Sequence, residues 1–277
     1  MLKSFTISRN DEIDSLAIGG FDGMHRGHQV LISKLSKKGA VLNIDRGGEG
    51  LTPKNSRCLY HDKQCIVVAF EAIKGLLAEE FIQMLQKQLP QLKRIVVGYD
   101  FHFGKGRVGD VALLEKLFSG EVLVVEEVFY AGHSVHSRYI KDLLTEGDIL
   151  QANALLGREY SVEGVVIKGQ GLGQKSLYPT FNLACGDFFL PKPAVYVTRC
   201  EIAGRLYPSV SFVGKRLSTD GQFSVETHIL DEDFSVTVDT MTLYFVDYLR
   251  ENRKFDDLGD LKEQIAQDIK SAKLRLA

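Results

Sequence analysis

Apolar and polar positions follow one pattern in the first half of the chain and another in the second half. Up to about residue 125, short continuous apolar runs alternate with stretches in which apolar residues recur every three or four positions. The continuous runs are typical of strands buried on both faces, and the other stretches of amphipathic helices. We therefore expect strands at 16–18, 40–44, 65–70, 94–97 and 122–125, and helices within 30–35, 79–88 and 111–118.

This alternation predicts a parallel sheet with helices on both faces, because neighbouring parallel strands need a crossover connection. Such crossovers are right-handed, which makes a doubly wound, nucleotidyltransferase-like (Rossmann-like) α/β domain the expected fold. Residues 47–53 are rich in glycine and lack periodicity, so we expect a loop there. Two further helical patterns, at 137–144 and 149–156, each end before a glycine.

From Tyr160 onward the chain changes to short strands separated by turn residues. This pattern indicates an antiparallel barrel or sandwich, and a charged amphipathic helix is expected from about residue 257 to 276. The domain boundary is placed near Arg158, which gives domains 1–158 and 159–277. The apolar residues that define the expected strands are Val162, Val165, Ile167, Val195, Val197, Ile202, Val210, Val225 and Val236.

Length and composition fit two soluble globular domains, with 277 residues, of which 44% are hydrophobic and 25% charged. A net charge of −2 gives no reason to expect nucleic acid or an anionic membrane as a partner. No apolar run approaches the ~20 residues that span a bilayer, and residues 1–10 lack the apolar core of a signal peptide. We expect a cytoplasmic protein, and the sequence carries no signal of its oligomeric state.

The cysteines, at positions 58, 65, 185 and 200, show no Cys-x-x-Cys spacing that would indicate a zinc or redox site. Cys65 and Cys200 lie in apolar, strand-like surroundings. We expect both to be buried thiols in a reduced protein, which agrees with a cytoplasmic location.

A glycine-rich segment, residues 20–28, joins the first expected strand to the first expected helix and reads Gly-Phe-Asp-Gly-Met-His-Arg-Gly-His. Its glycines let the backbone approach a phosphate, and the amides of a helix N-terminus attract an anion. His25 and His28 are three residues apart, so their imidazoles project from one face and can donate hydrogen bonds to a phosphoryl group. The segment predicts transfer chemistry at the two histidines and nucleotide binding by Gly20, Phe21, Asp22 and Gly23.

Two ordinary histidines near a glycine-rich turn are the alternative interpretation, and a zinc site lacks a third ligand at a suggestive spacing. The HxGH pattern is, however, similar to that of the nucleotidyltransferase superfamily, and its longer form to that of bacterial FAD synthetases. Residues 135–141 resemble the phosphate-contacting stretch of that family. This resemblance implies further nucleotide contacts by Ser137, Arg138 and Lys141.

A second block, residues 98–105, resembles the flavin-holding segment G-x-D-F-x-F-G-K of the same family. An aromatic ring can stack on an isoalloxazine, and a carboxylate can fix its polar edge. The resemblance implies that Asp100, Phe101 and Phe103 bind the flavin. A hairpin with two core phenylalanines is the alternative.

In the second domain, residues 179–183 resemble the P-T-x-N motif of riboflavin kinases. Thr180 and Asn182 offer hard oxygen ligands suited to the Mg²⁺ of a bound ATP. Residues 224–231 resemble the family's V-E-x-H-x-L-D strand, which implies that Glu226 accepts the 5′-hydroxyl proton of riboflavin. Residues 164–173 resemble its strand and glycine-rich loop, which implies nucleotide contacts by Gly169 and Gly173.

The chain is identified by these blocks as a member of the bifunctional riboflavin kinase/FMN adenylyltransferase family. The resemblance implies that the C-terminal domain converts riboflavin and ATP to FMN and ADP, and that the N-terminal domain converts FMN and ATP to FAD and pyrophosphate. Mg²⁺ is the expected metal, and ATP, riboflavin and FMN are the expected small-molecule partners.

Two alternatives remain open at this point. The first is a monofunctional FMN adenylyltransferase whose kinase domain only binds flavin. Phe212, which stands where the family has an asparagine, and the altered loop at 173–177 motivate it. The second is a protein without catalytic activity that senses flavin nucleotides.

Overall fold

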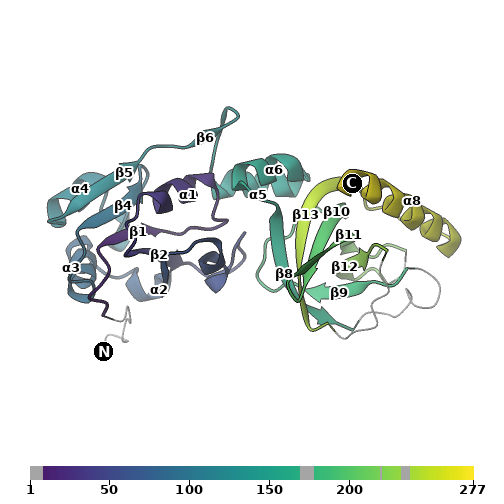
Figure 1. Ribbon diagram of the computed structural model, residues 1–277, viewed down its shortest axis with the longest axis horizontal. Helices are drawn as coiled ribbons and strands as arrows, with labels where there is room; N and C mark the ends of the chain where they lie inside the picture. Colours follow the sequence, from purple (N-terminus) through teal and green to yellow (C-terminus); the bar gives the residue numbers. More distant parts are fainter. Residues whose placement is uncertain (1–8, 169–177, 219, 232–237) are drawn as a thin grey trace. The chain divides into compact units, whose positions relative to one another are not determined.

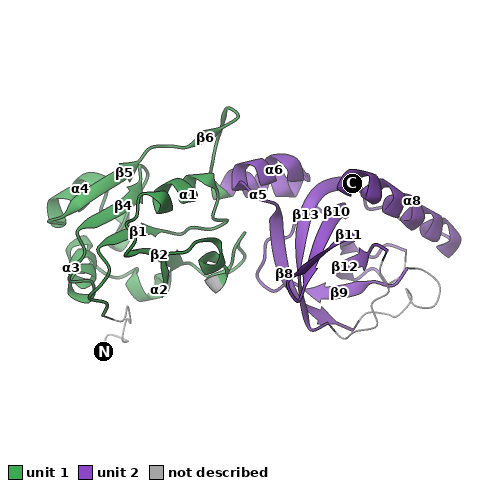
Figure 2. Ribbon diagram, viewed as in Figure 1, with its two compact units in different colours: residues 1–137 green, residues 138–277 purple. Residues whose placement is uncertain are grey.

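The computed structural model describes residues 9–168, 178–218, 220–231 and 238–277. The chain forms two compact units, Met1–Ser137 and Arg138–Ala277 (Figure 2). The predictions for Gly169, Gly173, Val236 and the loop at 173–177 lie outside the described residues.

The first unit is built on a parallel sheet with the strand order β3-β2-β1-β4-β5 (Figure 1). The predicted doubly wound α/β domain is thus confirmed. The strands are β1 (Ser15–Gly19), β2 (Gly39–Asp45), β3 (Gln64–Ala69), β4 (Arg94–Gly98) and β5 (Glu121–Val125). The helices are α1 (Arg26–Ser33), the 3₁₀ segment η1 (Lys54–Tyr60), α2 (Phe70–Ile73), α3 (Ala78–Gln88), the 3₁₀ turn η2 (Lys105–Arg107) and α4 (Val111–Leu117).

Successive residues of the central strand β1 pack on opposite sides of this sheet. Leu16 and Ile18 lie in a core shared with Phe81 of α3 and Leu114 of α4. Ala17 lies in a second core, which contains Leu31 and Ile32 of α1. Both faces are therefore buried, which explains why the strands read as continuous apolar runs.

The predicted antiparallel structure of the second unit is a closed barrel with the strand order β10-β11-β12-β9-β8-β13 (Figure 1). The ring closes because β13 pairs with both β10 and β8. The strands are β8 (Tyr160–Ile167), β9 (Phe181–Ala184), β10 (Ala194–Ile202), β11 (Arg205–Lys215), β12 (Phe223–Ile229) and β13 (Thr240–Glu251).

A short helical hairpin, α5 (Ser137–Glu146) and α6 (Ile149–Leu156), precedes the barrel. The boundary was predicted near Arg158, but the second compact unit begins at Arg138. It therefore includes α6 and all of α5 except Ser137. Asn153 of α6 explains this grouping: its Nδ2 donates to the Phe245 carbonyl at 2.8 Å, and its Oδ1 accepts from the Tyr160 amide at 2.6 Å. The division of function near Arg158 stays a prediction.

The terminal helix α8 (Leu258–Leu276) covers one side of the barrel through Ile269 and Ala272. Its buried Asp268 takes a two-pronged hydrogen bond from Arg250 of β13, with Nε–Oδ1 at 2.8 Å and Nη2–Oδ2 at 2.7 Å. Such fork-shaped pairing fixes geometry as well as charge. Among the residues that the structure describes, no helix combines the length and apolar character needed to cross a membrane.

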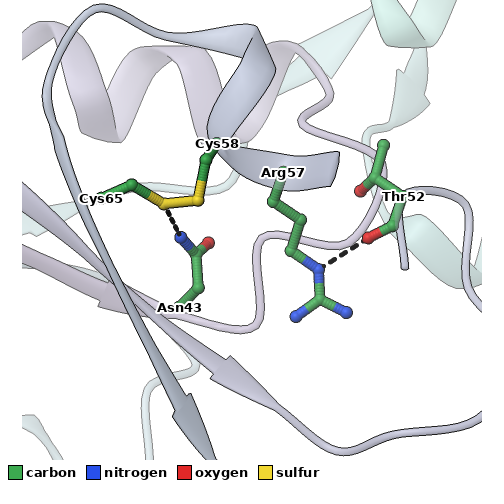
Figure 3. The surroundings of a disulfide bond; sticks show 5 residues. All are labelled: Asn43, Thr52, Arg57, Cys58 and Cys65. Carbon is green, nitrogen blue, oxygen red and sulfur yellow. Dashed lines mark hydrogen bonds between the residues drawn. A yellow bond between two sulfur atoms is a disulfide. The ribbon is translucent and has the colours of Figure 1, made fainter. Parts of the chain in front are cut away.

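The cysteine prediction is wrong for Cys65, which forms a disulfide with Cys58 (Figure 3). The 3₁₀ segment η1 brings Cys58 back to the start of β3, and the two Cα atoms lie 5.6 Å apart, within the ordinary range for a disulfide. Cys200 is a buried thiol, as predicted, and so is Cys185. Burial raises the pKa of each of these two thiols to about 11.

A thiol titration tests this arrangement directly. With an aromatic disulfide reagent at pH 8 and no reductant, the native protein should show almost no reactive thiol, because Cys185 and Cys200 are buried. After denaturation two thiols should react, and after reduction and denaturation all four cysteines. Four reactive thiols in the unreduced, denatured protein would show that Cys58 and Cys65 are not paired.

Candidate active sites

The order of the parallel strands reverses beside β1, which lies between β2 and β4. Parallel strands present their carboxyl ends at one edge, and the point of reversal opens a crevice where open α/β sheets bind ligands. The loop that follows β1 is the glycine-rich segment with the two histidines, and the loop that follows β4 is the predicted flavin segment. The topology therefore brings the two motifs to neighbouring strand ends.

The loop between β1 and α1 has an unusual backbone. Phe21, Gly23 and Met24 have φ values of 48°, 84° and 43°. The side chains of Phe21 and Met24 are buried in the core beneath the loop, each with 1% exposure. A nucleotide contact by Phe21 is therefore restricted to its backbone.

Polar contacts hold the loop from two sides. The Gly23 amide donates to Oγ1 of Thr52 at 2.7 Å, and the Thr52 amide donates to Oδ1 of Asp22 at 3.0 Å. The Ser137 hydroxyl donates to the Asp22 carbonyl at 2.7 Å. Ser137 and Asp22, which the sequence assigned to one nucleotide site from distant segments, are thus brought together, whereas Thr52 was missed.

The two histidines lie against each other at the start of α1. His25 is the N-cap residue of the helix and is 5% exposed. Its ring stacks on that of His28 with centroids 3.5 Å apart and planes 19° apart. A Cβ on Gly27 would lie 3.2 Å from the His25 ring, so glycine at this position leaves room for the stacked pair. The predicted common face of the two imidazoles is present, and their catalytic role stays a prediction.

The flavin segment after β4 divides into exposed and buried residues. Asp100 is exposed, Phe101 is partly buried, and Phe103 is 6% exposed in the core beside Phe81. The Phe101 and Phe103 rings stack with centroids 5.6 Å apart. Phe103 thus has the core position of the alternative interpretation, and the flavin contacts of these three residues stay predictions.

A polar network that the sequence did not reveal lies at the ends of β4 and β5. Glu127 Oε1 accepts hydrogen bonds from the Ser134 hydroxyl and from Nε2 of His136, the latter at 3.1 Å. These hydrogen bonds lower the pKa of Glu127, and desolvation and the charge of Glu127 raise the pKa of Tyr99. The small hairpin of β6 (Phe129–Tyr130) and β7 (His133–Ser134) supplies Ser134.

Arg138 and Lys141, the predicted phosphate contacts near the domain boundary, lie on α5. Arg138 is exposed, and the Lys141 ammonium lies 5.5 Å from the ring centre of Phe189, within the same unit. Their nucleotide contacts stay predictions.

The barrel brings the predicted kinase residues together by strand register. Asn182 of β9 and Glu226 of β12 are direct cross-strand partners, and Glu226 is also paired with Phe212 of β11. Directly paired residues project from the same face of a sheet. Asn182 is 9% exposed, whereas Thr180, just before β9, is exposed.

Glu226 is held by Arg216 and Ser224. Its Oε1 accepts from Arg216 Nη1 at 3.2 Å and from the Ser224 hydroxyl at 2.9 Å. Arg216 also donates two hydrogen bonds to the Asp220 carboxylate, from Nε to Oδ1 at 3.0 Å and from Nη2 to Oδ2 at 2.8 Å. Although desolvation opposes it, hydrogen bonds from the Gln222 amide and from Arg216 lower the pKa of Asp220. One oxygen of Glu226 is thus fixed, and Oε2 makes no hydrogen bond to the described residues.

His228, two residues beyond Glu226, links the two kinase motifs. Its Nδ1 lies 2.8 Å from the Pro179 carbonyl, and its ring packs edge-on against Tyr178 with centroids 5.4 Å apart. The imidazole therefore fixes the turn that carries Thr180 relative to β12. Its signal in the sequence was its place in the V-E-x-H strand, but it was not predicted as a site residue.

The residues of this site fit a phosphate-bound Mg²⁺ better than a metal held by protein alone. In the described ranges no group of three or more His, Cys, Asp or Glu side chains could hold a metal ion. Asn182 offers an amide oxygen at the position paired with Glu226, and Thr180, two residues earlier in the chain, offers a hydroxyl. Mg²⁺ in nucleotide sites is bound through one or two protein oxygens together with substrate phosphates and water.

Comparison with known proteins assigns a family to each half of the chain. A family model described as riboflavin kinase matches residues 156–276. A family model described as FAD synthetase matches residues 7–46 and 60–139. The two matches together include every predicted site residue except Lys141.

Curated relatives match nearly the whole chain under the name bifunctional riboflavin kinase/FMN adenylyltransferase. The relative from Pseudomonas fluorescens is 28% identical over 282 residues, covering 92% of this chain and 91% of its own length. The relative from Escherichia coli (strain K12) is 27% identical over 288 residues, covering 93% and 91%. A crystal structure titled Macrolide-efflux Protein from Streptococcus pneumoniae shares the fold, with a TM-score of 0.84, 25% identity and coverage of 96% and 95%.

Replacing Ser137 by alanine tests its link to the β1–α1 loop. Ser137→Ala removes the donor to the Asp22 carbonyl, and one such hydrogen bond contributes about 1 kcal/mol. The midpoint of thermal unfolding of the first unit should fall by about 3 °C in calorimetry.

Ser33→Ala is the matched control. The Ser33 hydroxyl is exposed and donates only to Val30 within its own helix, so the midpoint should not fall. Equal midpoints for wild type and Ser137→Ala would show that this hydrogen bond does not hold the loop.

Proposed function

We infer that this chain, which belongs to the bifunctional riboflavin kinase/FMN adenylyltransferase family, makes FMN from riboflavin in its second unit and FAD from FMN in its first. The observation that carries the inference is the match of both family models to separate halves of one chain. It favours two working enzymes over a monofunctional adenylyltransferase. It also favours an enzyme over a flavin sensor without activity.

We propose that adenylyl transfer takes place beside the β1–α1 loop. An oxygen of the FMN phosphate attacks the α-phosphate of ATP, the bond to the leaving pyrophosphate breaks, and no protein nucleophile is needed. The stacked His25 and His28 donate hydrogen bonds to the phosphoryl oxygens as charge develops on them. The amides at the start of α1 and the backbone of residues 20–22 are proposed to bind the same anion, with Ser137 and Thr52 holding the loop.

The flavin of FMN is proposed to lie against the segment after β4. Asp100 is exposed there and can accept a hydrogen bond from a polar edge of the ring. Phe101 supplies the accessible aromatic face, and the buried Phe103 supports it from below. Arg138 and Lys141 are proposed as cations for the nucleotide phosphates.

Riboflavin phosphorylation is proposed to take place at the paired positions of β9 and β12. Glu226 accepts the proton of the 5′-hydroxyl through Oε2 while Arg216 and Ser224 hold Oε1. The hydroxyl oxygen then bonds to the γ-phosphate of ATP, and ADP leaves. Thr180 and Asn182 would hold Mg²⁺, which neutralises charge on the ATP phosphates when bound.

Both reactions consume ATP, so we keep the cytoplasm as the proposed location. The disulfide between Cys58 and Cys65 does not contradict this proposal, because cytoplasmic disulfides occur, though rarely, and most are transient.

Product analysis with two single variants tests the division of labour. The purified protein is incubated with MgATP and either riboflavin or FMN, and flavins are separated by chromatography. His28→Ala should abolish FAD formation and leave FMN formation intact, and Glu226→Gln should do the reverse, each by at least about a hundredfold.

Each variant serves as the folding control for the other, because the two activities belong to one chain. If wild type makes FAD from FMN but no FMN from riboflavin, the second unit only binds flavin. If a folded variant loses both activities, the assignment of one reaction to each unit is wrong.

The Mg²⁺ assignment has its own test. Thr180→Ala should raise the Mg²⁺ concentration needed for half-maximal FMN formation by about tenfold, because a hydroxyl ligand is lost. Thr180→Ser keeps the hydroxyl and should stay close to wild type. Equal Mg²⁺ dependence of wild type and Thr180→Ala would remove Thr180 from the metal site.

A further inference from the structure

The β1–α1 loop adopts a backbone that needs external support. Phe21 and Met24 have positive φ values although neither is glycine, and each such residue costs roughly 1 kcal/mol or more. Strained backbone of this kind persists only where the surrounding structure determines it. The question is which residues determine it here.

Thr52 makes two hydrogen bonds to the loop from outside it. Its side chain is fully buried, with 0% exposure. Oγ1 accepts the Gly23 amide at 2.7 Å, and its own amide donates to Asp22 Oδ1 at 3.0 Å. The Gly23 amide is therefore occupied by protein, and the direction of the following residues is set by Thr52.

Thr52 is in turn held by Arg57, a residue that is 6% exposed (Figure 3). Nε donates to the Thr52 carbonyl at 2.9 Å, and Nη2 lies 3.4 Å from Asp45 Oδ1 at the end of β2. Nη1 is buried and has no hydrogen-bond partner among the described residues. A buried cation with an unsatisfied donor is costly, which indicates that this arrangement serves more than packing.

The segment that carries these residues is anchored just beyond them. Cys58 follows Arg57 and is bonded to Cys65 of β3, whose sulfur accepts from Nδ2 of the buried Asn43 at 3.0 Å (Figure 3). Arg57 is thus fixed between the Thr52 carbonyl on one side and a covalent link to the sheet on the other.

The family model for FAD synthetase leaves out residues 47–59, the stretch that contains Thr52, Arg57 and Cys58. No family motif therefore assigns a role to these residues. We propose that Thr52 and Arg57 are positioning residues for adenylyl transfer, and that they hold the β1–α1 loop so that His25 and His28 meet the reacting phosphate. This inference rests on the proposed FMN adenylyltransferase activity of the first unit.

The side chain of Thr52 is tested by an isosteric and a conservative substitution. Thr52→Val keeps the shape but leaves the Gly23 amide without its acceptor, so kcat for FAD formation should fall by about tenfold or more. KM for FMN should not change, because the hydrogen bonds of Thr52 go to Asp22, Gly23 and Arg57 and not to the flavin segment after β4. Thr52→Ser keeps the hydroxyl and should stay within about twofold of wild type.

A double-mutant cycle tests whether Arg57 acts through Thr52. Arg57→Met removes the donor to the Thr52 carbonyl and should lower kcat for FAD formation by about tenfold. In the Thr52→Val background the same change should have a much smaller effect, because the contact that it supports is already lost. Additive effects would overturn the coupling between the two residues.

FMN formation from riboflavin is the control within the same molecule and should be unchanged in all variants. A wild-type kcat for FAD formation in Thr52→Val would overturn the proposal. An equal loss of both activities would show a general defect in folding and would overturn it as well.

Amide exchange separates this inference from the proposed function. In protein labelled with ¹⁵N-glycine, the Gly23 amide should be protected in wild type and Thr52→Ser and exposed in Thr52→Val. Wild type that makes no FAD would contradict the proposed function, while the exchange result would still show whether Thr52 holds the loop. Equal exchange in Thr52→Val and wild type would overturn the inference by itself.

Discussion

The positive φ angles of the β1–α1 loop are the constraint on which the first unit depends. They turn the chain sharply from the central strand into α1 and place His25 at the cap of that helix. The side chains of Phe21 and Met24 fill the core below the turn, while Thr52 and Ser137 hold its polar atoms above. The same turn therefore determines both the packing of this core and the geometry of the site.

In the barrel, the candidate site residues are positioned by strand pairing. No strained turn is needed, because the register of β9 against β12 alone places Asn182 beside Glu226. Inside the barrel, hydroxyl groups bond to one another: Thr198 Oγ1 lies 2.8 Å from the hydroxyls of Ser209 and Ser211. Thr227 of β12 joins this cluster by accepting from the Ser211 hydroxyl at 2.8 Å, so a slip of β12 by one residue would turn Thr227 out of the barrel and Glu226 into it.

The sequence predicted the parts of the molecule that local pattern controls. Continuous apolar runs located the parallel strands, because both faces of the sheet are buried. Motif residues such as His25, His28 and Glu226 indicated the two candidate sites. Phe70, expected at the end of a strand, instead begins the short helix α2. A run of six apolar residues does not show where the sheet ends.

Features that depend on distant partners were not predictable in the same way. Cys58 and Cys65 pair only because η1 folds back onto β3, and neither residue carries a local signal for a disulfide. Thr52 lies in the glycine-rich, aperiodic stretch 47–53, which was expected to be a loop, and Arg57 lies just beyond it. The role of Thr52 follows from contacts with residues 29 and 30 positions away, which no periodicity records.

The closure of the barrel has a consequence for synthesis on the ribosome. The last strand, β13, closes the barrel because it pairs with β8 on one side and with β10 on the other. The barrel therefore stays open until residues up to Glu251 have left the exit tunnel, whereas the parallel sheet has all its strands once Val125 has emerged. Because domains fold as units from the N-terminus, the half that makes FAD is complete in the nascent chain before the half that makes its substrate.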